Sequence, residues 1–181
     1  QFLPRIGTDN AQGEIYLTDL VSLGSAAGRP MGAVRTADVE SSLGINSRAD
    51  LAKAAGVLNR RLLHQMMLDG VTVLDPANTW VEPGVRVGPD TELLPGTMLS
   101  GNTAIGSGCL VGPQARLVDS QVGDRVTVQY SVLLQARVAD GSTIGPFAYL
   151  RPGTEIGPGA RVGDFVEIKN STIGAGSKVP H

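Results

Sequence analysis

The chain has 181 residues, a formal net charge of −2 and one cysteine, Cys109. Acidic and basic residues are mixed without a basic run, so the charge pattern typical of nucleic-acid binding is missing. A single cysteine excludes an intramolecular disulfide and a cysteine cluster for a metal, and it fits a reducing compartment. The apolar stretches are shorter than the ~20 residues of a membrane span, and no signal-like leader is found. We therefore expect a cytoplasmic protein that binds neither nucleic acid nor a membrane.

Glycine and proline are concentrated in the second half of the chain. Of the 24 glycines and 11 prolines, 16 and 8 follow residue 80, which predicts a boundary between two differently built parts near residues 75–80. The sequence begins at Gln1 rather than Met and ends within a repeat at His181. We therefore expect the chain to be the central part of a longer protein.

The first half contains few expected elements. Apolar spacing predicts helices over residues 14–27 and 47–68, with a short strand over 31–35 between them. Ser47 and Asp50 resemble a capping box at the start of the second helix. So few elements in about seventy residues cannot enclose a good core, so this part is expected to complete a larger α/β domain. It has no glycine loop for phosphate binding and does not encode a complete nucleotide site.

The second half has a period of six residues. Aliphatic residues recur at this spacing and are often followed by glycine, a pattern typical of hexapeptide β-helices. Each hexapeptide is expected to supply one short strand and one turn, and three of them close a triangular coil around the aliphatic side chains. A β-sandwich would instead show period-two alternation. The aliphatic positions are Val81, Val87, Leu93, Leu99, Ile105, Val111, Leu117, Val122, Val128, Leu134, Val138, Ile144, Leu150, Ile156, Val162, Ile168, Ile173 and Val179.

The period is interrupted three times, and the glycines suggest how the coils turn. The steps from Leu117 to Val122 and from Ile168 to Ile173 are five residues, and the step from Leu134 to Val138 is four. We interpret these slips as loops or irregular corners. The glycine after each aliphatic residue is expected to relieve crowding where the backbone turns, with a positive φ angle.

Five motifs occur in one linear order along the chain. They are Asn10–Asp19 (NAQGEIYLTD), Gly44–Arg48 (GINSR), Phe147–Gly153 (FAYLRPG), Val162–Lys169 (VGDFVEIK) and Gly176–His181 (GSKVPH). Together they resemble the bacterial bifunctional family of N-acetylglucosamine-1-phosphate uridyltransferase / glucosamine-1-phosphate N-acetyltransferase. The resemblance covers essentially the whole chain.

The resemblance implies a fold class and domain boundaries. We expect a mainly β protein with a left-handed parallel β-helix of hexapeptide repeats, preceded by a partial α/β nucleotidyltransferase domain and a linking helix. Residues 1–46 would be the C-terminal part of the uridyltransferase domain, 47–70 the linking helix, and 71–181 the β-helix of the acetyltransferase domain. In this family the β-helix forms a homotrimer, and acetyl-CoA and glucosamine-1-phosphate meet in clefts between subunits.

For the acetyltransferase site, the resemblance implies three residues. Arg151 and Lys169 match the basic residues that hold the sugar phosphate, which suits charge-assisted hydrogen bonds to an anion. His181 matches the general base that removes a proton from the sugar amine as the amine attacks the thioester of acetyl-CoA. The unperturbed pKa of imidazole, about 6.5, suits this role.

For the uridyltransferase site, the resemblance implies only part of a site. Tyr16 and Thr18 match positions near the sugar phosphate, and Asn46 matches a Mg²⁺ ligand. The family's glycine-rich phosphate loop and aspartate metal ligand have no counterpart in this sequence. UTP and N-acetylglucosamine-1-phosphate would be the substrates of the complete site, and UDP-N-acetylglucosamine for peptidoglycan and lipopolysaccharide the product.

Other interpretations remain open from the sequence alone. The chain could be another hexapeptide acyltransferase, a sugar-nucleotide pyrophosphorylase with a β-helix tail, or a non-catalytic trimerising β-helix. A β-helix carbonic anhydrase fits poorly, because it needs three histidines at a zinc and the chain has only His64 and His181. Asn46 could simply cap the helix that follows it. Cys109 follows a glycine in a turn and is expected to be a packing residue rather than a nucleophile.

Overall fold

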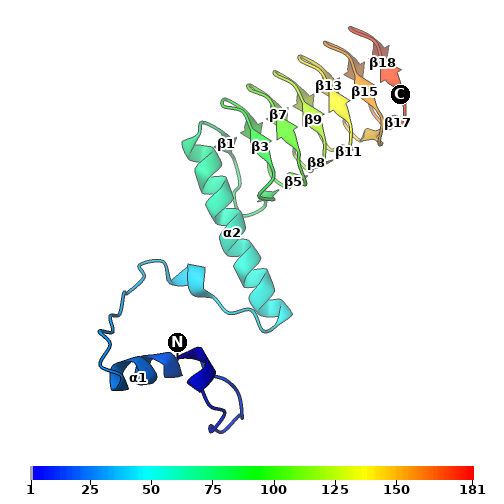
Figure 1. Ribbon diagram of the computed structural model, residues 1–181. Helices are drawn as coiled ribbons and strands as arrows, with labels where there is room; N and C mark the ends of the chain where they lie inside the picture. Colours follow the sequence, from blue (N-terminus) through cyan, green and yellow to red (C-terminus); the bar gives the residue numbers. More distant parts are fainter. Residues whose placement is uncertain (1) are drawn as a thin grey trace. The chain divides into compact units, whose positions relative to one another are not determined.

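The computed structural model describes residues 2–181. It divides the chain into two compact units, Gln1–Leu43 and Gly44–His181, which are described separately (Figure 1). The second unit contains all of the hexapeptide repeats, so it holds the candidate residues of the acetyltransferase site.

The first unit has little regular structure. It contains the 3₁₀ helices η1 (Leu3–Arg5) and η2 (Val39–Ser42) and the α-helix α1 (Asp19–Ala26), which is shorter than predicted. The strand predicted over residues 31–35 is wrong, because no strand forms within residues 2–43 to pair with it. A lone extended segment without a neighbouring strand leaves its backbone groups unpaired.

The second unit begins with the helix α2 (Arg48–Leu68). Ser47 is its N-cap: the Ser47 hydroxyl accepts from the Asp50 backbone N–H at 3.1 Å and donates to the Asp50 carboxylate at 2.7 Å. The helix predicted over residues 47–68 and its capping pair are therefore confirmed. Among residues 2–181, no helix has both the length and the apolar character needed to cross a membrane.

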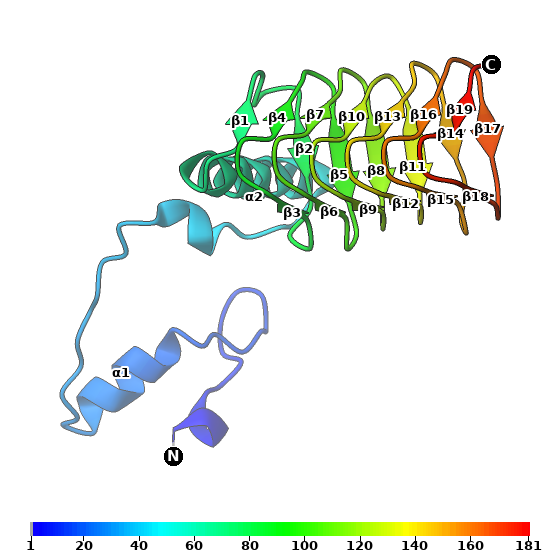
Figure 2. The same cartoon turned by 90° about the horizontal axis from the view of Figure 1, so that it is seen from above.

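The rest of the second unit is a parallel β-helix (Figure 2). Its 19 short strands form three parallel sheets, because each chain turn contributes one strand to each sheet in rotation. Sheet A contains β1 (Thr72–Val73), β4 (Glu92–Leu93), β7 (Leu110–Val111), β10 (Thr127–Val128), β13 (Thr143–Ile144), β16 (Arg161–Val162) and β19 (Lys178–Val179). Sheet B contains β2 (Trp80–Val81), β5 (Met98–Ser100), β8 (Arg116–Val118), β11 (Val132–Leu134), β14 (Tyr149–Leu150) and β17 (Glu167–Ile168). Sheet C contains β3 (Arg86–Val87), β6 (Ala104–Ile105), β9 (Gln121–Val122), β12 (Arg137–Val138), β15 (Glu155–Ile156) and β18 (Thr172–Ile173).

The predicted aliphatic positions line the interior with one exception. Leu133, with no exposed surface, occupies the inward position in β11, whereas the predicted Leu134 is only partly buried. The supposed step of six followed by four is therefore two steps of five, Val128 to Leu133 to Val138. The period of six is therefore interrupted at four corners, each one residue short, rather than at the three predicted places. Each has a residue with left-handed φ: Asp119 (48°), Tyr130 (46°), Gln135 (47°) and Asn170 (47°).

The glycines that follow aliphatic residues allow close stacking of the coils. A Cβ atom added to Gly106 would lie 2.7 Å from the carbonyl carbon of Gly123 in the next coil, so a side chain does not fit there. The expected relief of crowding is confirmed. The expected positive φ is found at Gly112 (107°) and Gly145 (97°) but is wrong for Gly106, whose turn has its left-handed glycine at Gly108 (63°).

Helix α2 closes the end of the β-helix where the coils begin (Figure 1). The buried carboxamide of Asn59 donates to the Thr79 carbonyl at 2.9 Å and accepts from the Val81 backbone N–H at 2.9 Å. These are edge groups of β2, the terminal strand of sheet B. Leu63, one turn further along α2, is buried in the core of the β-helix. Asn59 thus takes the place of a neighbouring strand, which satisfies the exposed sheet edge.

Candidate acetyltransferase site

Arg151 and Lys169 follow paired strands in adjacent coils of sheet B. In the register of β14 and β17, Leu150 pairs with Ile168, and the Arg151 backbone N–H donates to the Ile168 carbonyl at 2.8 Å. Arg151 and Lys169 each come directly after this pair. Neighbouring parallel strands lie about 4.8 Å apart, so the structure brings the two predicted phosphate-binding cations side by side.

Arg151 is held by two neighbours that the sequence analysis did not identify. Its guanidinium donates to the Glu167 carboxylate at 2.7 Å and lies 5.9 Å from the ring centroid of Tyr149. The hydrogen bond to Glu167 raises the pKa of Arg151, mainly by favouring the charged form. Glu167 lies nearly one full coil after Arg151 in the sequence. The repeat length could therefore have predicted that the two residues are neighbours. The arginine side chain remains 37% exposed and can also reach an anion.

His181 lies at a different corner from these cations. It follows β19 of sheet A, whereas Arg151 and Lys169 follow strands of sheet B. Its side chain is exposed. The structure therefore brings two of the three predicted acetyltransferase residues together and leaves the predicted base separate, two strands further along the coil than Lys169.

The residues predicted for the uridyltransferase site belong to different units of the chain. Tyr16 is partly buried and Thr18 exposed, just before α1, while Asn46 lies in the other unit just before α2. The capping role considered for Asn46 is wrong, because Ser47 is the N-cap. Among residues 2–181, no group of three or more His, Cys, Asp or Glu side chains could hold a metal ion. Mg²⁺ requires several oxygen ligands, so Asn46 alone does not make a magnesium site, and its role as one ligand stays a prediction.

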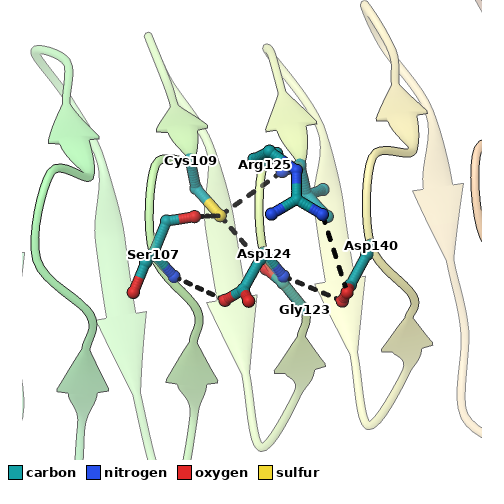
Figure 3. Close-up of polar contacts among 7 residues, drawn as sticks. Ser107, Cys109, Gly123, Asp124, Arg125 and Asp140 are labelled. Carbon is teal, nitrogen blue, oxygen red and sulfur yellow. Dashed lines mark hydrogen bonds and ion pairs between the residues drawn. The ribbon is translucent and has the colours of Figure 1, made fainter.

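Cys109 is a structural residue of the interior. Its side chain is buried, and its thiol donates to the Gly123 carbonyl at 3.1 Å while accepting from the Val126 backbone N–H at 3.4 Å. Burial raises the pKa of Cys109 and keeps it protonated, which is the opposite of an activated nucleophile. Figure 3 shows the sulfur between stacked coils, beside carboxylates that accept backbone N–H groups of neighbouring turns. The expected packing role is confirmed.

A stack of exposed aromatic rings lies along the corner between sheets A and B. The rings of Tyr130 and Phe147 have centroids 5.4 Å apart, and those of Phe147 and Phe165 are stacked at 5.4 Å. Phe165 is 78% exposed. All three have left-handed φ, a conformation in which a bulky side chain costs energy. The sequence analysis missed this stack because these residues fall outside the aliphatic rows. We name Tyr130, Phe147 and Phe165 the aromatic corner.

Known proteins share this sequence over nearly its full length. Residues 135–170 match the family described as Bacterial transferase hexapeptide (six repeats). The chain is 44% identical over 179 residues to the Bifunctional protein GlmU of Brevibacillus brevis, covering 99% of this chain and 39% of that protein. Against the protein of the same name from Clostridium beijerinckii, identity is 48%, with the same coverage. The chain belongs to the GlmU family. The resemblance inferred from five motifs is therefore confirmed.

The relation to GlmU proteins covers only part of their length. The chain spans 39% of the two GlmU relatives, so the activity, substrates and partners of a whole GlmU protein are proposals for it. Among solved structures, WeeI from Acinetobacter baumannii AYE matches 71% of this chain and 65% of its own, with a TM-score of 0.51 and 22% identity. At that identity the likeness concerns the fold alone, and it agrees with the parallel β-helix described above.

Proposed function

We propose that this chain carries part of an acetyltransferase site that transfers an acetyl group from acetyl-CoA to glucosamine-1-phosphate. The observation that supports this most directly is the pairing of Arg151 with Lys169 in adjacent coils. Because these cations follow neighbouring strands, they can share the oxygens of one phosphate group. The identity with GlmU proteins adds support from the sequence.

In the proposed reaction, the sugar amine attacks the carbonyl carbon of the thioester. The N–C bond forms, the C–S bond breaks, and the thiolate of coenzyme A leaves. His181 accepts the proton that the amine nitrogen loses. Arg151 and Lys169 orient the sugar by holding its phosphate, while Glu167 and Tyr149 fix the position of Arg151. Positioning of this kind lowers the barrier because the reacting atoms are already close.

A homotrimer is the proposed assembly, with each cleft formed between neighbouring copies. Its support is the distribution of exposed apolar side chains. The aromatic corner and the outward ring of Tyr149 on sheet B are all about one third exposed or more. Contiguous exposed apolar surface typically marks an interaction site. A neighbouring copy could also supply groups that approach Arg151 and Lys169.

Uridyl transfer from UTP to N-acetylglucosamine-1-phosphate belongs to the proposal only for a protein that contains the complete site. Residues 1–46 would then be the end of its uridyltransferase domain, with residues 47–70 as the linker and 71–181 as the acetyltransferase β-helix. Tyr16 and Thr18 are proposed to lie near the sugar phosphate. No chemical step is assigned to Mg²⁺, because Asn46 alone does not make a magnesium site.

The proposed acetyl transfer is tested by coenzyme A thiol release from acetyl-CoA with and without glucosamine-1-phosphate. We expect release that depends on the sugar and falls at least ~100-fold in His181→Ala. Lys169→Ala should weaken binding of the sugar phosphate about tenfold, because it removes a charge-assisted contact. Arg137→Ala, on the outer face of sheet C, is the matched cationic control and should change neither quantity. A folded chain that neither binds the sugar phosphate nor releases thiol would overturn the proposal.

A further inference from the structure

A cavity of about 530 Å³ lies near the start of the β-helix, far along sheet B from Arg151 and Lys169. Its walls are contributed by the loop before β2, by β2 and β5 themselves, and by the corners between sheets A and B in the next two coils. The lining includes Asn78, Trp80, Pro95, Gly96, Met98 and Gln114. The cavity shares no residue with the candidate acetyltransferase site.

One wall of the cavity is a loop in the first coil, which is longer than the next. More residues separate Thr72 from Glu92, its partner in the next coil, than separate Trp80 from its partner Met98. The additional residues form a loop that is held by its own hydrogen bonds. The Asp75 carboxylate accepts from the Ala77 backbone N–H at 3.1 Å and from the Asn78 carboxamide at 2.7 Å, and the Asn78 carbonyl accepts from the Gly96 N–H at 2.8 Å. This wall of the cavity is therefore fixed before any ligand binds.

The opposite wall is set by a glycine. Gly96 has φ of 77°, and a Cβ atom added to it would lie 2.5 Å from the carboxamide nitrogen of Gln114 in the next coil. The absence of a side chain at Gly96 lets the Gln114 carboxamide lie across the corner. Within residues 2–181 this carboxamide makes no hydrogen bond, so both its donor and its acceptor are available to a ligand.

The chemistry of the lining selects a class of ligand. Trp80 and Met98 are cross-strand partners, 40% and 50% exposed, and they offer a flat polarisable surface. No charged side chain lines the cavity within the described part of the chain, so an ionised group gains nothing there. A glutamine carboxamide can pair with adjacent donor and acceptor atoms of a purine edge, and aromatic side chains stack on bases.

We propose that this cavity binds a purine base, with the ring stacked on Trp80 and Met98 and its edge hydrogen-bonded to Gln114. The volume falls within the range of small-molecule sites. Because the lining residues are uncharged, recognition concerns the neutral base and not a phosphate attached to it. The proposal is independent of the acetyltransferase function.

The test uses the fluorescence of Trp80, the only tryptophan in the chain. Adenosine is titrated to about 10 mM, a range that detects affinities weaker than about 1 mM. We expect saturable quenching, and AMP should give the same dissociation constant within about twofold because phosphate contributes nothing. Saturable binding of AMP without adenosine binding would overturn the proposal, since it would show recognition of phosphate instead.

Two variants separate the base site from general quenching. Gln114→Leu retains the size of the side chain but removes its hydrogen bonds, and should weaken adenosine binding about fivefold. Gln121→Leu, on the outer face of sheet C, is the matched control and should leave binding unchanged. Both positions are on the surface, so far-ultraviolet circular dichroism should be unaltered. Equal quenching in the parent chain and in Gln114→Leu would overturn the assignment, as would the lack of saturation in the parent chain.

Discussion

The two units of this chain use apolar residues in opposite ways. In the β-helix, Leu117, Leu133 and Ile144 have no exposed surface, because coils above and below cover them completely. In the first unit, Leu17 is 67% exposed and Val34 is 98% exposed. The β-helix is a repeat whose coils bury one another, whereas the first unit has too few elements to bury its own apolar residues.

This difference teaches where a sequence pattern can be trusted. In a hexapeptide repeat, each coil is covered by the next one, since the next coil has the same shape and the same row of aliphatic side chains. The first unit contains apolar residues without a period, so their pattern does not specify what covers them. Four substitutions test the comparison, from the largest expected loss of stability to the smallest.

The largest effect is expected in the interior of the β-helix. Leu133→Ala removes a fully buried side chain and should lower the free energy of unfolding by about 2–5 kcal/mol. The matched variant Leu134→Ala, at the adjacent, only partly buried position, should cost less than about 1 kcal/mol. Urea denaturation followed by circular dichroism measures both values. A larger loss for Leu134→Ala would restore the register expected from the sequence and refute the two five-residue steps.

The same leucines show what the sequence could and could not predict about the fold. Most inward positions were predicted because aliphatic residues recur clearly with the period of six. At Leu133 and Leu134 the pattern is ambiguous, because both residues are leucine and the corners on either side are one residue short. Only the pairing of β11 with its neighbours resolves which one points inward.

The candidate site also has features that the sequence could predict and features that it could not. Arg151 and Lys169 are separated by one full coil of three hexapeptides, so their proximity follows from the repeat length. The contact of Arg151 with Glu167 depends on side-chain conformation, which periodicity does not specify. His181 follows a strand of sheet A rather than sheet B, so the repeat places it at a different corner from the two cations. The residues of the aromatic corner lie outside the aliphatic rows but recur at intervals of one coil, so their spacing was the signal that could have revealed the stack.

The second largest effect is expected where α2 closes the β-helix. Asn59→Leu removes the partners of the Thr79 carbonyl and the Val81 N–H, and should lower the free energy of unfolding by about 2 kcal/mol. Gln65→Leu on the same helix is the control, since its exposed carboxamide bonds only Asp69. It should change stability by less than about 0.5 kcal/mol. Hydrogen exchange should report faster exchange at Val81 in Asn59→Leu only; unchanged exchange there would show that the cap is dispensable.

A smaller, pH-dependent effect is expected at Cys109. Burial raises its pKa above the ordinary 9.0. As pH rises above this value, the unfolded chain loses the thiol proton while the folded chain keeps it, so the unfolded state binds fewer protons and stability falls. Between about pH 8 and pH 10 the free energy of unfolding should therefore fall more in the parent chain than in a chain without this thiol. Urea denaturation of the parent chain and Cys109→Ala at both pH values isolates this contribution. The same pH dependence in both proteins would contradict it.

The smallest effect is expected in the first unit. Val34 is almost fully exposed, so Val34→Ser removes no buried apolar surface and should change the free energy of unfolding by less than about 0.5 kcal/mol. Val128→Ser, the same substitution at a position without exposed surface, places a hydroxyl inside the β-helix and should cost at least about 2 kcal/mol. Urea denaturation of the two variants compares one chemical change in the two environments. Equal losses would mean that Val34 packs against a partner as Val128 does, and that the two units do not differ in how they use apolar residues.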